Sequence, residues 1–75
     1  MKRDDEVALT RRAFAAYFRA GGTDQPAASD SGVESHAHLE YVVLRNINGV
    51  LAVYRVRNDG VLKGLKRWPA EFEIF

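Results

Sequence analysis

The chain has 75 residues, of which 47% are hydrophobic and 28% are charged, proportions typical of one small globular domain and not of a disordered segment. It contains no cysteine, which excludes disulfide scaffolds, thiol nucleophiles and cysteine-based zinc sites. No apolar run approaches the length of a membrane span, and no signal-peptide pattern follows the charged start. We therefore expect a single cytoplasmic domain over residues 1–75 that does not bind a membrane.

The first predicted element is a helix from about residue 4 to residue 20. Alanine is frequent there and neither glycine nor proline interrupts the stretch, so intrinsic propensity favours a helix. Gly21 can adopt the left-handed conformation that ends a helix, and the polar, glycine-containing stretch 21–32 is expected to be a loop. Arg12 and Arg19 should lie opposite the apolar stripe of the helix. That stripe is expected to contain Val7, Thr10, Ala13, Phe14, Tyr17 and Phe18.

Residues 33–67 change to the pattern of β-strands, rich in Val, Leu and Tyr and divided by turns. Residues 33–35 are an alternative fourth strand at the edge, and residues 68–75 form an aromatic C-terminal tail. The predicted fold is α+β: the helix packs on one face of a three- or four-stranded antiparallel meander, as a two-layer sandwich. The three main strands are expected over residues 41–45, 50–57 and 61–67.

The register of the meander follows from its two turns, each of which ends in glycine after Asn or Asp. Two-residue turns would mix polar and apolar side chains on both faces of the sheet. Turns with a glycine bulge pair Asn46 with Val50 and Arg57 with Val61, which gathers apolar side chains on one face. The helix-facing residues are then Val42, Leu44, Val50, Ala52, Tyr54, Val56 and Leu62. Gly64 falls opposite Tyr54, whose ring can cover it.

The outer face of this sheet is basic. Residues 41–67 contain six basic residues and one acidic residue, an excess of five positive charges (six minus one), although the whole chain has a net charge of +1. One hypothesis is therefore a non-catalytic binding module that meets an anionic partner, nucleic acid first, through this face. The candidate nucleic-acid-binding residues are Arg45, Arg55, Arg57, Lys63 and Arg67.

The same outer face carries more aliphatic surface than a solvated sheet should expose. The alternative hypothesis is therefore a protein–protein interaction domain or a homodimer. Its candidate interaction surface is Tyr41, Val43, Leu51, Val53, Leu65, Trp68 and Phe72. The tail could instead cover this face from within, which we favour because Glu71 and Glu73 could pair with Arg55 or Lys63. Packing beside the helix is the other position open to the tail.

Catalysis and metal binding have little support in the sequence. His36, His38 and Glu40 would share one side of an extended strand, a weak metal pattern that we expect instead in an exposed turn. The Gly21-Gly22 pair follows a helix, whereas phosphate-binding glycines precede one. We expect no enzyme activity, no metal, no cofactor and no small-molecule substrate.

Overall fold

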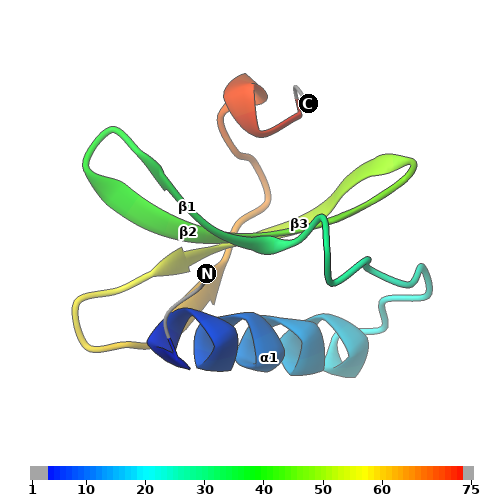
Figure 1. Ribbon diagram of the computed structural model, residues 1–75, viewed down its shortest axis with the longest axis horizontal. Coiled ribbons are helices and arrows are strands. Elements are labelled where there is room, and N and C mark those ends of the chain that lie inside the picture. Colours follow the sequence, from blue (N-terminus) through cyan, green and yellow to red (C-terminus); the bar gives the residue numbers. More distant parts are fainter. Residues whose placement is uncertain (1–3, 74–75) are drawn as a thin grey trace.

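The computed structural model describes residues 4–73, and the predicted α+β architecture is confirmed. The four strands form one antiparallel sheet in the order β1-β2-β3-β4, so the alternative edge strand exists as β1. Figure 1 shows α1 across one face of the sheet and the short helix η1 on the other side. None of the described helices is long and apolar enough to cross a membrane. The elements are α1 Asp4–Arg19, β1 Gly32–His36, β2 Leu39–Asn46, β3 Gly49–Val56, β4 Leu62–Gly64 and the 3₁₀ helix η1 Ala70–Glu73.

Two glycines end α1 at the predicted place. Gly21 has a φ of 96°, and its N–H donates to the carbonyl oxygen of Phe18 at 3.1 Å. The Gly22 N–H donates to the Tyr17 carbonyl oxygen at 3.0 Å, which completes a Schellman cap. A Cβ on Gly22 would lie 2.4 Å from the Tyr17 ring. The cap therefore requires glycine for its backbone conformation at Gly21 and for space at Gly22.

The face of α1 that packs on the sheet differs from the predicted stripe. Ala13 is fully buried in a cluster with Val42 and Leu44, and Leu9 packs against it together with Phe14 and Tyr17. Val7 and Phe18, both predicted to face the sheet, are 37% and 43% exposed. The helix is therefore turned toward Leu9, Ala13 and Tyr17, a row at spacing i, i+4, i+8. The small side chain of Ala13 at the centre of that row allows the helix to approach the sheet closely.

The predicted register is confirmed in the middle of the sheet. Val42 pairs with Tyr54, and Tyr54 pairs with Gly64 on its other side. The second turn closes as predicted, because the Arg57 N–H donates to the Val61 carbonyl oxygen at 2.9 Å. A Cβ on Gly64 would lie 3.4 Å from Cε1 of Tyr54. The tyrosine ring therefore lies over the glycine, as expected.

The first turn is tighter at its tip than predicted. Asn46 pairs with Gly49 rather than with Val50, and the register shifts between Leu44 and Arg45. The Asn46 side chain accepts a hydrogen bond from the main-chain N–H two residues later, at 2.8 Å, which holds the tight turn. Because of the shift, Val50 does not join the helix-facing cluster and packs instead with the tail on the opposite face.

The C-terminal tail covers the outer face of the sheet, the position that the sequence favoured. Phe72 is 3% exposed and forms a second buried cluster with Tyr41, Val43 and Val53. Within residues 4–73, the predicted pairs of Glu71 or Glu73 with strand cations do not form. Residues 74 and 75 of the predicted tail lie outside the described part of the chain. The partly buried residues that pack against this cluster are Val50, Leu65 and Trp68.

Candidate anion-binding site

Arg45, a candidate nucleic-acid contact, is buried and hydrogen-bonded within the protein. It is 6% exposed. Its Nε and Nη2 atoms donate to the Phe72 carbonyl oxygen at 3.1 Å and 2.7 Å, and its Nη1 atom donates to the Glu34 carboxylate. The prediction that Arg45 lies on an open basic face is wrong. The physical reason is that η1 ends over β2 and presents a carbonyl oxygen to the guanidinium.

The main chain of Arg45 binds the loop before β1 in the same way. Its N–H donates to Oγ of Ser31 at 3.0 Å. Its carbonyl oxygen accepts from the Ala27 N–H at 2.7 Å and from the Ser31 hydroxyl at 3.3 Å. Arg45 therefore connects β2 with the loop, with β1 and with the tail. Its guanidinium therefore stabilises the fold.

A different group of cations stays in solvent where β3 and β4 meet. Arg55, Arg57 and Lys63 are all exposed. Arg55 lies directly opposite Lys63 in the register, and Tyr41 lies opposite Arg55 on the other side. Like charges directly opposite one another destabilise a sheet. Arg55 and Lys63 are therefore a like-charged pair across the two strands.

The three cations line one hollow of about 560 Å³ together with Asn58 and Asp59. Asp59 is the acid of this hollow, and its Oδ2 atom lies 3.8 Å from Nη2 of Arg57. Its Oδ1 atom accepts from a main-chain N–H of the same turn at 3.1 Å. Within residues 4–73, no ion pair is formed by Arg55 or Lys63. We call Arg55, Arg57 and Lys63 the basic corner. Arg67, also a predicted contact, is exposed but does not line the hollow.

Arg12 and Arg19 are two further cations near β4, and neither was among the binding residues predicted from the sequence. They line a hollow of about 260 Å³ between α1 and β4. The sequence placed them opposite the apolar stripe, which is correct for a solvated face but gives no indication of a neighbouring strand. The other residues that line this hollow are Ala15, Ala16, Val61 and Leu62.

The candidate protein-interaction surface is largely covered by the protein itself. Tyr41, Val43, Val53 and Phe72 are buried, and the remaining predicted members of that surface, Leu51, Leu65 and Trp68, are partly buried. The alternative in which this surface stays open is therefore wrong for its central residues, because Phe72 of the tail covers them. A partner that used these central residues would first have to displace the tail.

The two histidines lie at a tight turn and do not gather ligands. Ala37 and His38 have positive φ angles of 53° and 67° and connect His36 to Leu39, which pair across the turn. His36 has its Nε2 atom 3.9 Å from a Glu71 carboxylate oxygen and its ring edge-on to Phe72. In the part of the chain that the structure describes, no three His, Cys, Asp or Glu residues could hold a metal ion.

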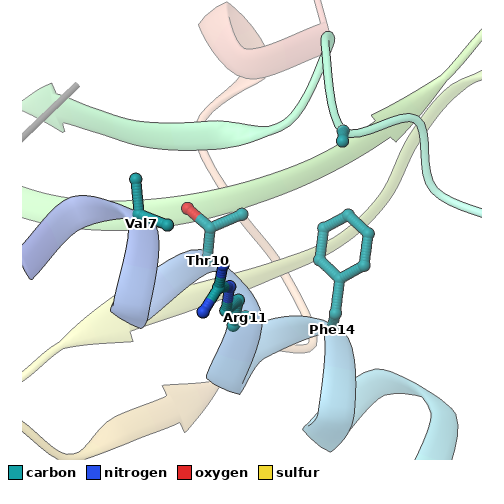
Figure 2. Close-up of a pocket in the computed structure, with 5 residues that line it drawn as sticks. Val7, Thr10, Arg11 and Phe14 are labelled. Atoms are coloured by element: carbon teal, nitrogen blue, oxygen red, sulfur yellow. The ribbon is translucent and has the colours of Figure 1, made fainter. Parts of the chain in front are cut away.

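An apolar hollow of about 370 Å³ lies between α1 and the loop that follows it. Val7, Thr10 and Phe14 extend from the same side of the helix (Figure 2), and Arg11 and Ala28 complete the lining. The Thr10 hydroxyl donates to the main chain of α1 at 2.9 Å. This hollow therefore offers apolar surface and one cation.

One titratable group near β4 has a shifted pKa. Partial burial raises the pKa of Tyr54 above its ordinary value, and the neighbouring Tyr17 adds to the effect. Both rings pack in the helix-facing cluster. Tyr54 therefore acts as a packing residue, with its hydroxyl kept neutral.

Comparison with known proteins finds no match to a family model, to a curated protein or to a solved structure.

Proposed function

We propose that the protein is a small non-catalytic binding module that takes an anionic partner at the basic corner. One observation carries this proposal: Arg55 and Lys63 are directly opposed, exposed and without an acidic partner among the described residues. Such a pair costs stability, whereas a bound anion would convert the repulsion into attraction. Arg57 in the same hollow adds a third positive charge.

The shape of the corner limits the kind of contact that is proposed. The tail covers the middle of the outer face, so a flat basic sheet of the kind that enters the major groove of DNA is absent from residues 4–73. The corner instead offers a hollow at the end of the β3–β4 pair, suited to a few anionic groups on an extended partner. Phosphates of a single-stranded nucleic acid and carboxylates of an acidic polypeptide are the two chemistries that fit.

The test measures binding of two labelled probes, a short oligothymidylate and an oligoglutamate, by fluorescence anisotropy. Affinity should fall steeply between about 50 mM and 200 mM salt if several cations contact the probe. Lys63→Glu should weaken binding by about tenfold. Arg11→Glu is the matched control, because it changes the net charge equally at an exposed helix position away from the corner. Equal losses in both variants, or no binding of either probe at low salt, would contradict the proposal.

A further inference from the structure

The outer edge of β4 presents main-chain groups that no strand pairs. The N–H of Arg57 and the N–H of Leu65 each bond across the β3–β4 pair, to Val61 and Val53 respectively. Because hydrogen-bonded positions alternate along an antiparallel pair, the main-chain groups of Leu62 and Gly64 point away from β3. The sheet order places no further strand beyond β4 within residues 4–73. Two residues of β4 are therefore free to accept a strand.

This free edge has cations on both sides. On the helix side, Arg12 and Arg19 line the hollow between α1 and β4 together with Ala15 and Ala16. On the tail side, the register places Lys63 beside Arg55. A fifth strand would alternate its side chains between these two sides, so acidic side chains on either side would meet a cation.

We infer that the anionic partner is an extended acidic polypeptide that adds to β4 as a fifth antiparallel or parallel strand. This inference rests on the proposed function and names its partner class. Main-chain hydrogen bonds to Leu62 and Gly64 supply the alignment, as in other cases of strand addition to an open edge. The flanking cations select acidic side chains, and Ala15 and Ala16 in the lining of the hollow leave room for one small apolar side chain.

The opposite edge of the sheet does not offer the same conditions. The side chains of β1 include Glu34, which is bonded to Arg45, and His36, which lies beside Glu71. These carboxylates already have partners, and β1 itself carries no lysine or arginine that would attract an acidic strand. The main-chain groups of Ser35 point outward on β1 by the same alternation. Ser35 therefore has outward main-chain groups like those of Gly64, but at an edge that does not attract acidic side chains.

The first experiment uses the unmodified protein and the blocked peptide acetyl-Asp-Glu-Val-Glu-Asp-amide. Two methylated analogues are compared with it, one with N-methyl groups on the second and fourth residues and one with N-methyl groups on all five. A paired strand turns only one set of alternate N–H groups toward β4. The first analogue keeps one unmethylated edge and should bind as the parent peptide does, whereas the second has no free edge and should bind about tenfold more weakly at the same charge. Isothermal titration at low salt measures all three affinities.

The second experiment places proline at each edge of the sheet. Gly64→Pro removes an outward N–H from β4, a change that an edge strand tolerates, and it should weaken the peptide by about tenfold. Ser35→Pro makes the same change at β1 and should leave the affinity unaltered. Circular dichroism checks that both variants are folded. If Gly64→Pro does not fold, the comparison of the two methylated analogues still decides the question.

The outcomes separate this inference from the proposed function. Equal binding of the two methylated analogues would overturn strand addition while leaving an anion-binding corner in place. Binding of a short oligothymidylate without binding of the peptide would also overturn it and would assign the corner to nucleic acid. Binding of neither probe would overturn the proposed function itself. A concentration-dependent dimer that competes with the peptide would make a second copy of this chain the occupant of β4.

Discussion

Arg45 and Arg55 lie on neighbouring strands, and both belong to the side of the sheet that the tail covers. Arg45 is 6% exposed and donates to Phe72 and to Glu34. Arg55 is exposed and faces Lys63, another cation. The two arginines occupy equivalent positions in the sequence pattern. The guanidinium of Arg45 is bonded within the fold, whereas that of Arg55 forms no ion pair among the described residues.

This difference separates stability from function within one small sheet. Removal of a charge that is paired within the fold should strongly lower the free energy of unfolding and leave partner binding unchanged. Removal of a charge that the fold leaves unpaired should change stability little and weaken binding. Truncation and substitution can test these two expectations separately.

Truncation after Arg67 removes η1 and with it the ring of Phe72. Loss of a buried phenylalanine from a core costs about 3–5 kcal/mol, which is most of the stability expected for a domain of this size. We expect the truncated chain to melt far below the full chain and to expose Tyr41 and Val53. Thermal denaturation and binding of a hydrophobic dye measure both effects. An unchanged melting temperature would show that the tail does not support the fold.

Arg45→Ala leaves the Phe72 carbonyl oxygen and the Glu34 carboxylate without their donor. We expect a loss of about 2–4 kcal/mol in the free energy of unfolding. Arg45→Lys should recover only part of this loss, because an ammonium cannot donate from separate nitrogen atoms as the guanidinium does. Arg67→Ala, at an exposed position, is the control and should change stability by at most about 0.5 kcal/mol. Urea denaturation measures the free energy of unfolding of each variant. Equal losses for Arg45→Ala and Arg67→Ala would contradict a structural role for the Arg45 side chain.

Lys63→Glu should act in the opposite direction at the basic corner. It replaces a repulsive cross-strand pair by an attractive one, worth about 0.2–1 kcal/mol of added stability, while anion binding falls. A double-mutant cycle with Arg55→Gln isolates the pair, because the gain should vanish when Arg55 is uncharged. A variant that loses stability and binding together would indicate that Lys63 is needed by the fold.

Tyr54 should give the smallest effect, visible only in alkaline solution. Its pKa is raised in the folded state, so the folded protein holds this proton more tightly than the unfolded chain does. The associated stability is present below the unfolded pKa of about 10 and is lost as the pH rises through the folded pKa. Tyr54→Phe should flatten the unfolding free energy in this range. An identical alkaline decline in both proteins would assign the effect to other groups.

Local patterns were sufficient to predict the helix and the order of the strands, but the strand expected over residues 61–67 is only β4, Leu62–Gly64, and η1 was not predicted. Alanine-rich sequence followed by Gly21 and Gly22 defines a helix with its cap, and alternation with glycine turns defines the meander and its central register. The tip of the first turn was missed, because Asn46 can stabilise either of two turns through its side chain, and the difference is one residue.

The candidate site was only partly predictable, for a physical reason. Alternation assigns Arg45, Arg55 and Lys63 to the same face but gives no information about what covers them. The position of η1 depends on contacts between residues 27 positions apart in the chain, such as Arg45 with Phe72. The rotation of α1 toward Leu9, and with it the place of Arg12 and Arg19 beside β4, depends equally on long-range packing.

The most direct test of the separation is a titration of the ¹⁵N-labelled protein with tripolyphosphate, followed by amide chemical shifts. Tripolyphosphate carries dense negative charge without being a nucleic acid or a peptide, so it reports where anions bind. We predict that the largest shifts fall on Arg55, Arg57 and Lys63 and on the turn between β3 and β4, with little change at Arg45. Largest shifts on α1 near Arg11, or shifts spread evenly over the surface, would contradict the account.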